Sequence, residues 1–246
     1  MNLAPHVMVE ADYEAMSRRA AQVIVEEVRA KSNLLLCCAT GSSPQRTYEL
    51  LAEARRDEPS LFERLRVVKL DEWGGLASGD PATCESYLRR WVIEPLRIAT
   101  DRYLTFRADT DDPAGECERI REMLLTHGPI DLCVLGLGVN GHLGMNEPAN
   151  DMTPVPHVAT LTEQTQQHAM LRSIEKPVRF GITLGMSDIL HSRKILLLIS
   201  GPAKRDAYKE LLRGGSTPRF PASFLWLHTG VTCICDRAAA GELDKP

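Results

Sequence analysis

The sequence lacks a long apolar run, an excess of basic charge and any pair of cysteines spaced as C-x-x-C. A helix that crosses a membrane needs about 20 apolar residues, so the first absence argues against a membrane protein. The formal net charge of -4 argues against binding to nucleic acid or to anionic lipid. The start of the chain also lacks a basic stretch followed by an apolar core, so we expect a cytoplasmic protein with no membrane or nucleic-acid partner.

The cysteines and histidines show no pattern typical of a metal site. The seven cysteines are odd in number and lie mostly inside apolar runs, which predicts reduced core thiols rather than disulfides or zinc ligands. The seven histidines include no H-E-x-x-H spacing, and no G-x-S-x-G stretch is present. We therefore expect neither a bound metal nor a serine nucleophile.

Apolar runs that alternate with helical patterns predict an α/β fold. Residues 12–30 have apolar side chains at helical spacing, and the run NLLLCCA that follows is typical of a buried strand. Further strands are expected at residues 65–70, 130–138, 193–200 and 231–236, and helices at 43–56, 84–96, 115–128 and 202–215. Continuous apolar strands between helices predict one doubly wound, mostly parallel sheet with helices on both faces. We assign residues 1–246 to a single domain, although two small domains would also fit the length.

In a parallel sheet ligands gather at the carboxyl ends of the strands, and the first predicted strand ends in the stretch ATGSSP. We expect Ser43 to cap the next helix and Pro44 to be its first residue. Free amides at a helix start, a glycine and two hydroxyls form a plausible cradle for a phosphate group. The stretch lacks the G-K-[ST] of a nucleotide P-loop, and simple helix capping would explain it equally well.

The second stretch, VVKLDEWGGL, places Asp71 and Glu72 between a strand and a flexible glycine turn. A carboxylate in apolar surroundings at a strand end has a raised pKa and can serve as a general base. An aspartate that merely forms the turn is the plain structural alternative.

The third stretch, LGLGVNGHLGMNEP, contains G-x-G-x-x-G at residues 136–141 after a predicted strand. A dinucleotide site would need a regular helix at this point, whereas Pro148 interrupts any helix early. We favour a catalytic loop whose glycine turns direct His142 and Glu147 into a cleft, where a carboxylate can orient an imidazole.

Residues 146–157 are the least regular segment of the sequence. They contain three prolines and no apolar periodicity. We expect this segment to form an active-site loop or lid.

Four segments, in this order, resemble the glucosamine-6-phosphate deaminase/isomerase family: TGSSP, KLDEWGGL, DLCVLGLGVNGHLGMNEP and SGPAKRDAY. Three more resemble the branch of galactosamine-6-phosphate isomerases or deaminases: TQQHAML, GITLGMSDIL and PASFLWLH. The resemblance runs from the first strand nearly to the end of the chain, and GHLGMNEP is its most specific part. It implies a single doubly wound α/β domain.

The resemblance also implies which residues bind the phosphate group of a sugar phosphate. Gly41, Ser42 and Ser43 would bind it through backbone amides and hydroxyl groups. Lys204 in GPAKRDA would add a cation, and Arg172 is a second candidate cation.

By the same resemblance, Asp71 is the base that moves a proton between two sugar carbons, and His142 is the acid and base that opens the sugar ring. Glu147 is the carboxylate that supports His142. Asn140 stands where the deaminases typically have aspartate, so one of two negative charges near His142 is missing. An amide can still form a hydrogen bond, but it cannot favour an imidazolium by charge.

The activity implied is that of an amino-sugar-6-phosphate isomerase/deaminase. It converts glucosamine 6-phosphate or galactosamine 6-phosphate and water to the ketose 6-phosphate and ammonia, with no organic cofactor or metal. Two alternatives stay open: a 6-phosphogluconolactonase, which shares the sheet and the phosphate loop, and a sugar-phosphate-binding protein without turnover. Family members range from monomers to hexamers, so a homo-oligomer is compatible with the resemblance.

Overall fold

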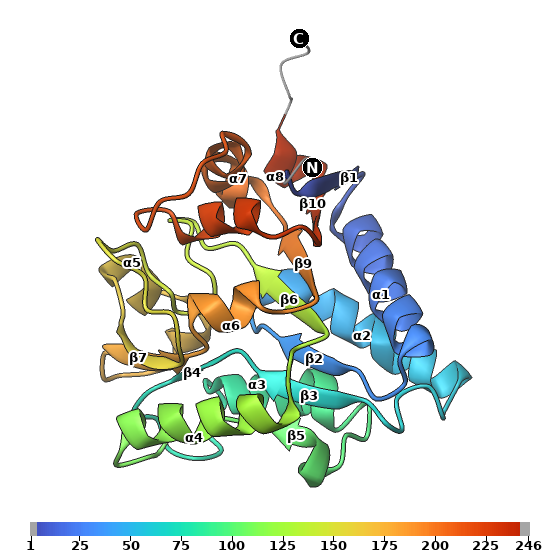
Figure 1. Ribbon diagram of the computed structural model, residues 1–246, viewed down its shortest axis with the longest axis horizontal. Coiled ribbons are helices and arrows are strands. Elements are labelled where there is room, and N and C mark those ends of the chain that lie inside the picture. Colours follow the sequence, from blue (N-terminus) through green and yellow to red (C-terminus); the bar gives the residue numbers. More distant parts are fainter. Residues whose placement is uncertain (1–3, 242–246) are drawn as a thin grey trace.

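The computed structural model describes residues 4–241. Its central sheet contains the strands β1 (His6–Glu10), β2 (Leu35–Cys38), β3 (Arg66–Lys69), β5 (Tyr103–Leu104), β6 (Leu132–Gly136), β9 (Lys194–Ile199) and β10 (Val231–Asp236). Their order across the sheet is β1-β10-β9-β6-β2-β3-β5, and every neighbouring pair is parallel (Figure 1). The predicted parallel sheet is therefore confirmed.

The order of the strands reverses between β2 and β6. From β2 the chain builds outward through β3 to β5 at one edge of the sheet. It then returns to β6, which pairs with the other side of β2, and continues through β9 to β10. The loops after β2 and β6 lead to opposite faces of the sheet, so a crevice opens between them at the carboxyl ends of the strands.

Helices cover both faces of the central sheet. The helices α1 (Tyr13–Ala30) and α2 (Ser42–Asp57) pack on one face, and α4 (Pro113–His127), α6 (Met186–Leu190) and α7 (Arg205–Leu212) pack on the other. Successive side chains of a strand point to opposite faces. On β2, Leu36 and Cys38 belong to the core between the sheet and α1 and α2, whereas Leu35 and Cys37 belong to the core on the opposite face. Both faces are buried, which is why the strands read as unbroken apolar runs.

A smaller antiparallel sheet, which the sequence did not predict, stands beside the central one. It contains β4 (Asp71–Trp73), β8 (Phe180–Thr183) and β7 (His157–Thr160), in that order. The chain leaves the central sheet after β3 and enters the smaller sheet two residues later. Asp71 therefore begins a strand of its own, and the alternative that it merely forms a turn is wrong. Strands of three or four residues are too short to show a period.

The remaining elements are short. The helix expected at residues 84–96 consists of α3 (Cys84–Leu88) and a π-helical turn, η1 (Arg89–Ile93). The others are η2 (Thr100–Arg102), α5 (Glu163–Gln166), η3 (Ala169–Leu171), η4 (Pro202–Lys204), η5 (Pro221–Leu227) and α8 (Arg237–Ala240). Strand β1, like β5, was not predicted.

Each of the seven cysteines is buried and carries a free thiol, as the sequence predicted. Among residues 4–241, no helix combines the length and the apolar character needed to cross a membrane.

Candidate active site

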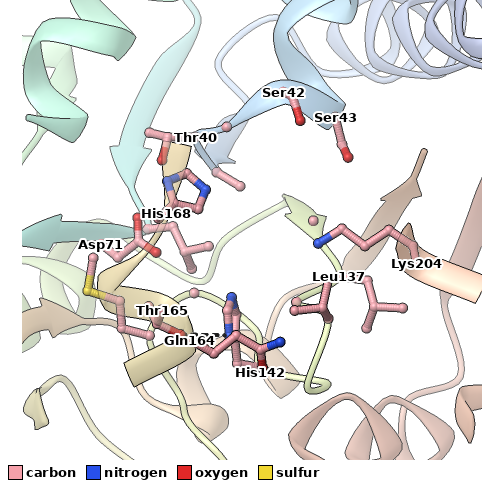
Figure 2. A pocket seen from close by; sticks show the side chains of 18 of the residues that line it. Thr40, Ser42, Ser43, Asp71, Leu137, His142, Gln164, Thr165, His168 and Lys204 are labelled. Atoms are coloured by element: carbon pink, nitrogen blue, oxygen red, sulfur yellow. Dashed lines mark hydrogen bonds between the residues drawn. The ribbon is translucent and has the colours of Figure 1, made fainter. Parts of the chain in front are cut away.

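A cavity of about 260 Å³ lies at the carboxyl ends of β2 and β6, where the strand order reverses. Its wall comes from residues within five parts of the chain: 39–43, 70–73 without Glu72, 136–145, 164–168 and Lys204. The cavity brings together six of the predicted site residues, which are Gly41, Ser42, Ser43, Asp71, His142 and Lys204 (Figure 2). Residues far apart in the sequence thus share one small, partly polar space.

The loop after β2 leads directly into the N-terminus of α2. Gly41 is the residue before the helix, and its φ of 102° is strained for any residue with a side chain. The carbonyl groups of Gly41 and Ser42 accept hydrogen bonds from Tyr87 and Tyr13, at 2.7 and 2.5 Å, which fix the loop. The first amides of a helix have no partner within it, so this terminus can bind an anion.

The sequence had suggested that Ser43 caps α2, and this prediction is wrong. Ser43 lies inside the helix, and Pro44 is the third helical residue rather than the first. The Oγ atom of Ser43 is 2.9 Å from Oγ of Ser200, at the end of β9, so the two hydroxyl groups share a hydrogen bond. The Ser43 side chain is therefore held at the edge of the cavity.

Lys204 reaches the same cavity from η4, which follows β9. Its side chain extends toward the space near Ser43 (Figure 2). Burial lowers the pKa of Lys204, because the ammonium group loses part of its hydration. Arg172, by contrast, is exposed and does not line the cavity. Its role as a second cation stays a prediction.

Asp71 supplies a buried carboxyl group to the cavity. The residue is 7% exposed, and its Oδ1 atom has no hydrogen-bond partner among the described residues. Burial and, next, the charge of Glu72 raise the pKa of Asp71 to about 7, although Lys69 opposes this shift. A carboxyl group with this pKa can both accept and release a proton near neutral pH.

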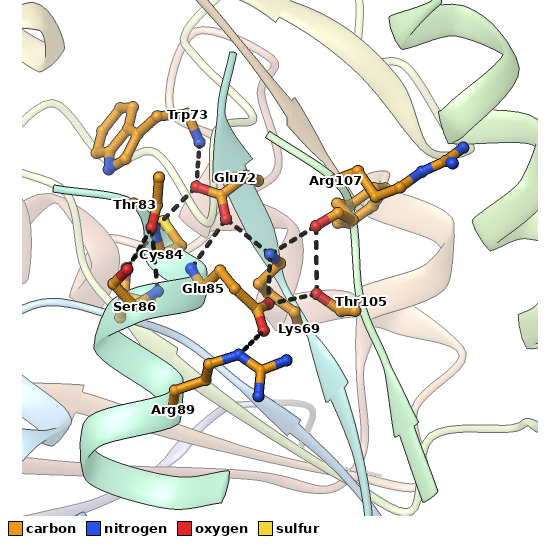
Figure 3. Close-up of polar contacts among 12 residues, drawn as sticks. Lys69, Glu72, Trp73, Thr83, Cys84, Glu85, Ser86, Arg89, Thr105 and Arg107 are labelled. Atoms are coloured by element: carbon orange, nitrogen blue, oxygen red, sulfur yellow. Dashed lines mark hydrogen bonds and ion pairs between the residues drawn. The ribbon is translucent and has the colours of Figure 1, made fainter. Parts of the chain in front are cut away.

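Glu72, the next residue, lies outside the cavity in a buried polar network (Figure 3). It accepts hydrogen bonds from the amides of Trp73, Cys84 and Glu85 and from Nζ of Lys69, at 2.7 to 2.9 Å. Lys69 also donates to Glu85 at 3.0 Å and to the carbonyl group of Phe106 at 2.7 Å. The network ties β3 and β4 to the start of α3 and holds the backbone that carries Asp71.

His142 is positioned by the glycine loop after β6. A side chain at Gly138 would place its Cβ atom 2.5 Å from the imidazole ring, so only glycine fits there. The Nδ1 atom of His142 is 3.7 Å from Oε2 of Glu147 and 3.5 Å from Oγ1 of Thr165. Residues 139–146 form turns and no helix, which argues against a dinucleotide site.

Asn140 connects the two ends of this loop. Its amide nitrogen donates to Oε2 of Glu147 at 2.9 Å, and its Oδ1 atom accepts from the amide of His142 at 3.2 Å. Burial alone would raise the pKa of Glu147, but the nearby imidazole of His142 and the hydrogen bond from Asn140, among others, outweigh it and lower that pKa. Glu147 is therefore a carboxylate that accepts hydrogen bonds behind the imidazole.

The segment expected to be a lid lies elsewhere. None of residues 146–157 lines the cavity, and only Glu147 among them approaches it, through His142. The wall is completed instead by Gln164, Thr165 and His168, from α5 and the turn before η3. We call residues 162–172 the covering segment. The sequence indicated this segment only through the resemblance of TQQHAML and through Arg172. It did not indicate Gln164, Thr165 and His168 as wall residues, because they follow a four-residue strand that no periodicity reveals.

The described part of the chain contains no cluster of metal ligands. Between residues 4 and 241, no three His, Cys, Asp or Glu side chains lie close enough together to hold a metal ion.

The chain is similar in sequence to known proteins over most of its length. The profile of the family described as "Glucosamine-6-phosphate isomerases/6-phosphogluconolactonase" matches residues 10–234. The chain is 42% identical to "Putative deaminase AgaI" of Escherichia coli (strain K12) over 91% of this chain and 88% of that protein. It is 36% identical to glucosamine-6-phosphate deaminase 1 of Bacillus subtilis (strain 168), over 95% of this chain and 98% of that one.

Solved structures agree with the sequence relatives. A monomeric glucosamine-6-phosphate deaminase superposes with a TM-score of 0.91 at 36% identity, covering 96% of this chain and 98% of that one. The 6-phosphogluconolactonase of Trypanosoma cruzi has a TM-score of 0.80 at 20% identity, covering 100% and 99% of the two chains, which shows a common fold. The chain therefore belongs to the glucosamine-6-phosphate isomerase/6-phosphogluconolactonase family.

Proposed function

We propose that this protein is an amino-sugar-6-phosphate isomerase/deaminase. It converts glucosamine 6-phosphate or galactosamine 6-phosphate and water to fructose or tagatose 6-phosphate and ammonia. One observation carries the proposal: a buried carboxyl group whose Oδ1 atom has no hydrogen-bond partner among the described residues (Asp71), an imidazole (His142) and an anion-binding helix terminus with a lysine line a single cavity.

The first step is the opening of the sugar ring. A closed pyranose must lose a proton from its C1 hydroxyl group and gain one at its ring oxygen. An imidazole exchanges both protons near neutral pH, and His142 has this role. Glu147 and Thr165 orient the ring from the Nδ1 side, so that Nε2 is left for the substrate.

The second step moves hydrogen from C2 to C1. Asp71 removes the proton from C2, and the electron pair of that bond forms a C1–C2 double bond while the aldehyde oxygen gains a proton. Protonation of the resulting enolamine at C1 leaves an iminium at C2. Water adds to C2, ammonia leaves, and the ketose remains. The raised pKa of Asp71 suits a base that must also return the proton.

The phosphate group anchors the open chain at a distance from these carbons. The amides at the start of α2, the hydroxyls of Ser42 and Ser43, and the ammonium group of Lys204 surround one end of the cavity. Binding energy at this end positions C1 and C2 near Asp71. Arg172, which is exposed and does not line the cavity, stays a candidate second cation.

An assay of ammonia release from glucosamine 6-phosphate and galactosamine 6-phosphate, run in parallel, tests the proposal. 6-Phosphogluconolactone serves as the control substrate, and its hydrolysis is measured in the same way. Ammonia release from at least one amino sugar supports the proposal. Lactone hydrolysis without ammonia would identify a lactonase, and thermal stabilisation by the sugars without product would identify a binding protein.

A further inference from the structure

His168 contributes a second imidazole to the cavity, from the covering segment. It is the residue before η3 and lines the wall beside the loop after β2. Its Nε2 atom lies 3.9 Å from where a Cβ atom of Gly41 would be. Its ring packs against Trp73, with the ring centroids 5.6 Å apart. None of the steps above uses this residue.

The hydrogen bonds of His168 fix its tautomer. Its Nδ1 atom accepts a hydrogen bond from the amide of Met170 at 3.3 Å. A nitrogen that accepts carries no proton, so the proton of the neutral ring is on Nε2. The Nε2–H group is therefore a donor on the cavity side of the ring, next to Gly41.

The imidazole of His168 is neutral at physiological pH. Burial is the main cause that lowers its pKa to about 4, and the positive charges of His142, Lys204 and Arg172 lower it further. A neutral donor suits a hydroxyl group of the sugar. A phosphate group is bound more strongly by charged donors.

The position of His168, on the same side of the cavity as Asp71, points to the carbons that follow the reacting end of the substrate. Figure 2 shows its ring between Thr40 and Asp71, whereas Lys204 and Ser43 lie together on the other side of the cavity. An open sugar phosphate with C2 at Asp71 and its phosphate group at Lys204 has the carbons that follow C2 closest to His168.

We propose that His168 is a specificity-determining residue whose Nε2–H group donates a hydrogen bond to the C3 or C4 hydroxyl group of the sugar. This inference rests on the proposed function, because it assumes the same substrate. A donor held on one side of the chain distinguishes substrates by the presence and orientation of that hydroxyl group.

A comparison of His168→Phe with the wild type on three substrates tests the inference. The substrates are glucosamine 6-phosphate and its 3-deoxy and 4-deoxy analogues. Phenylalanine keeps an aromatic ring against Trp73 but removes the donor. With the wild type, we expect one analogue to lose about tenfold in kcat/KM. With His168→Phe, that loss should shrink to less than about twofold, while the other analogue is affected equally in both proteins.

The variant His191→Phe, outside the cavity, is the matched control and should behave as the wild type. If both deoxy analogues lose as much with His168→Phe as with the wild type, the inference is overturned. A tenfold weaker inhibition of His168→Phe by inorganic phosphate would also overturn it, since it would assign His168 to the phosphate group.

A second readout does not need turnover. The Kd values of the same three sugars are measured by calorimetry for the Asp71→Asn variant with and without His168→Phe. If the wild type releases no ammonia from any sugar, the proposed function fails. The Kd values of the three sugars still decide the role of His168 in that case.

Discussion

Asp71 and Glu72 are consecutive residues of β4, yet one lines the cavity and the other lies in the buried network of Lys69. Successive side chains of a strand point to opposite sides, so two neighbouring carboxyl groups have different surroundings. Glu72 accepts four hydrogen bonds, whereas Oδ1 of Asp71 accepts none among the described residues. The strand thus places a structural carboxylate directly beside the proposed base.

The substitution Asp71→Asn should abolish exchange of the C2 hydrogen with solvent while largely preserving substrate binding. Asparagine keeps the size of the side chain but cannot accept the proton. We expect kcat to fall by about 10²–10⁴, the usual contribution of a positioned base. Exchange is measured by NMR in D₂O and binding by calorimetry. Retained exchange in the purified variant would contradict the assignment of Asp71.

The stability of this variant provides an independent control. Burial raises the pKa of Asp71 to about 7 in the folded state, so the folded protein binds a proton more strongly than the unfolded chain does. The contribution of Asp71 to the free energy of unfolding of the wild type therefore decreases as the pH rises from about 4 through 7. The asparagine side chain of the variant does not ionise, so the melting temperature of the variant relative to the wild type should increase over this range.

The pH dependence of kcat/KM should report the ionisation of Asp71. A base must be deprotonated, so the rate falls as the pH decreases below about 7. The substitution Glu72→Gln removes a charge that raises this pKa, and the acidic limb should move about one unit to lower pH. The phosphate group of the substrate also titrates near pH 6, but this titration affects kcat/KM of the wild type and of the variant equally. An unmoved limb in a folded Glu72→Gln variant would argue against Asp71 as the titrating base.

The substitution His142→Gln should slow the closed-ring substrate more than steps that do not need ring opening. Glutamine forms hydrogen bonds but does not exchange a proton near neutral pH. We expect kcat with glucosamine 6-phosphate to fall by about 10²–10³. In the reverse direction, with ammonium added, fructose 6-phosphate exchanges its C1 hydrogens through the iminium and enolamine, and this exchange on the open-chain fraction should fall by less. Equal activity with the wild type would remove His142 from the mechanism.

The substitution Lys204→Met should raise KM far more than it lowers kcat. Methionine keeps most of the length of the side chain but removes the partly buried charge near Ser43. We expect KM to increase by about 10–100-fold, the cost of losing a charged contact to a phosphate group. Lys209→Met, on α7 and outside the cavity, is the matched control. A KM within twofold of the wild type for Lys204→Met would exclude Lys204 from phosphate binding.

The substitution Asn140→Asp should raise the pKa of Glu147. The amide of Asn140 donates to Oε2 of Glu147, and aspartate would place a like charge there. NMR of ¹³C-labelled glutamate carboxyl groups can follow this titration. Asn140→Ala removes the hydrogen bond without adding a charge, so its effect should be smaller. An equal shift in both variants would mean that the charge at position 140 has no influence on Glu147.

The sequence by itself determined five of the seven strands of the central sheet and most of the helices that cover it. Residues 34–39 and 193–200 could be recognised because a strand buried on both faces is apolar throughout, and residues 12–30 because a helix buried on one face repeats every 3.6 residues. The turn at Gly41 and the histidine after Gly138 were found because loops at strand ends need glycine where the backbone bends or a side chain packs closely.

Only the tertiary structure decided which of these residues meet. Asp71 reaches the cavity because the chain passes from the central sheet into a second sheet, whose strands are too short for any pattern to show. His168 and Thr165 complete the wall from a segment with no regular period, while residues 146–157 stay outside it. Local sequence encodes the preference of each segment, but the neighbours of a side chain come from contacts between segments far apart in the chain.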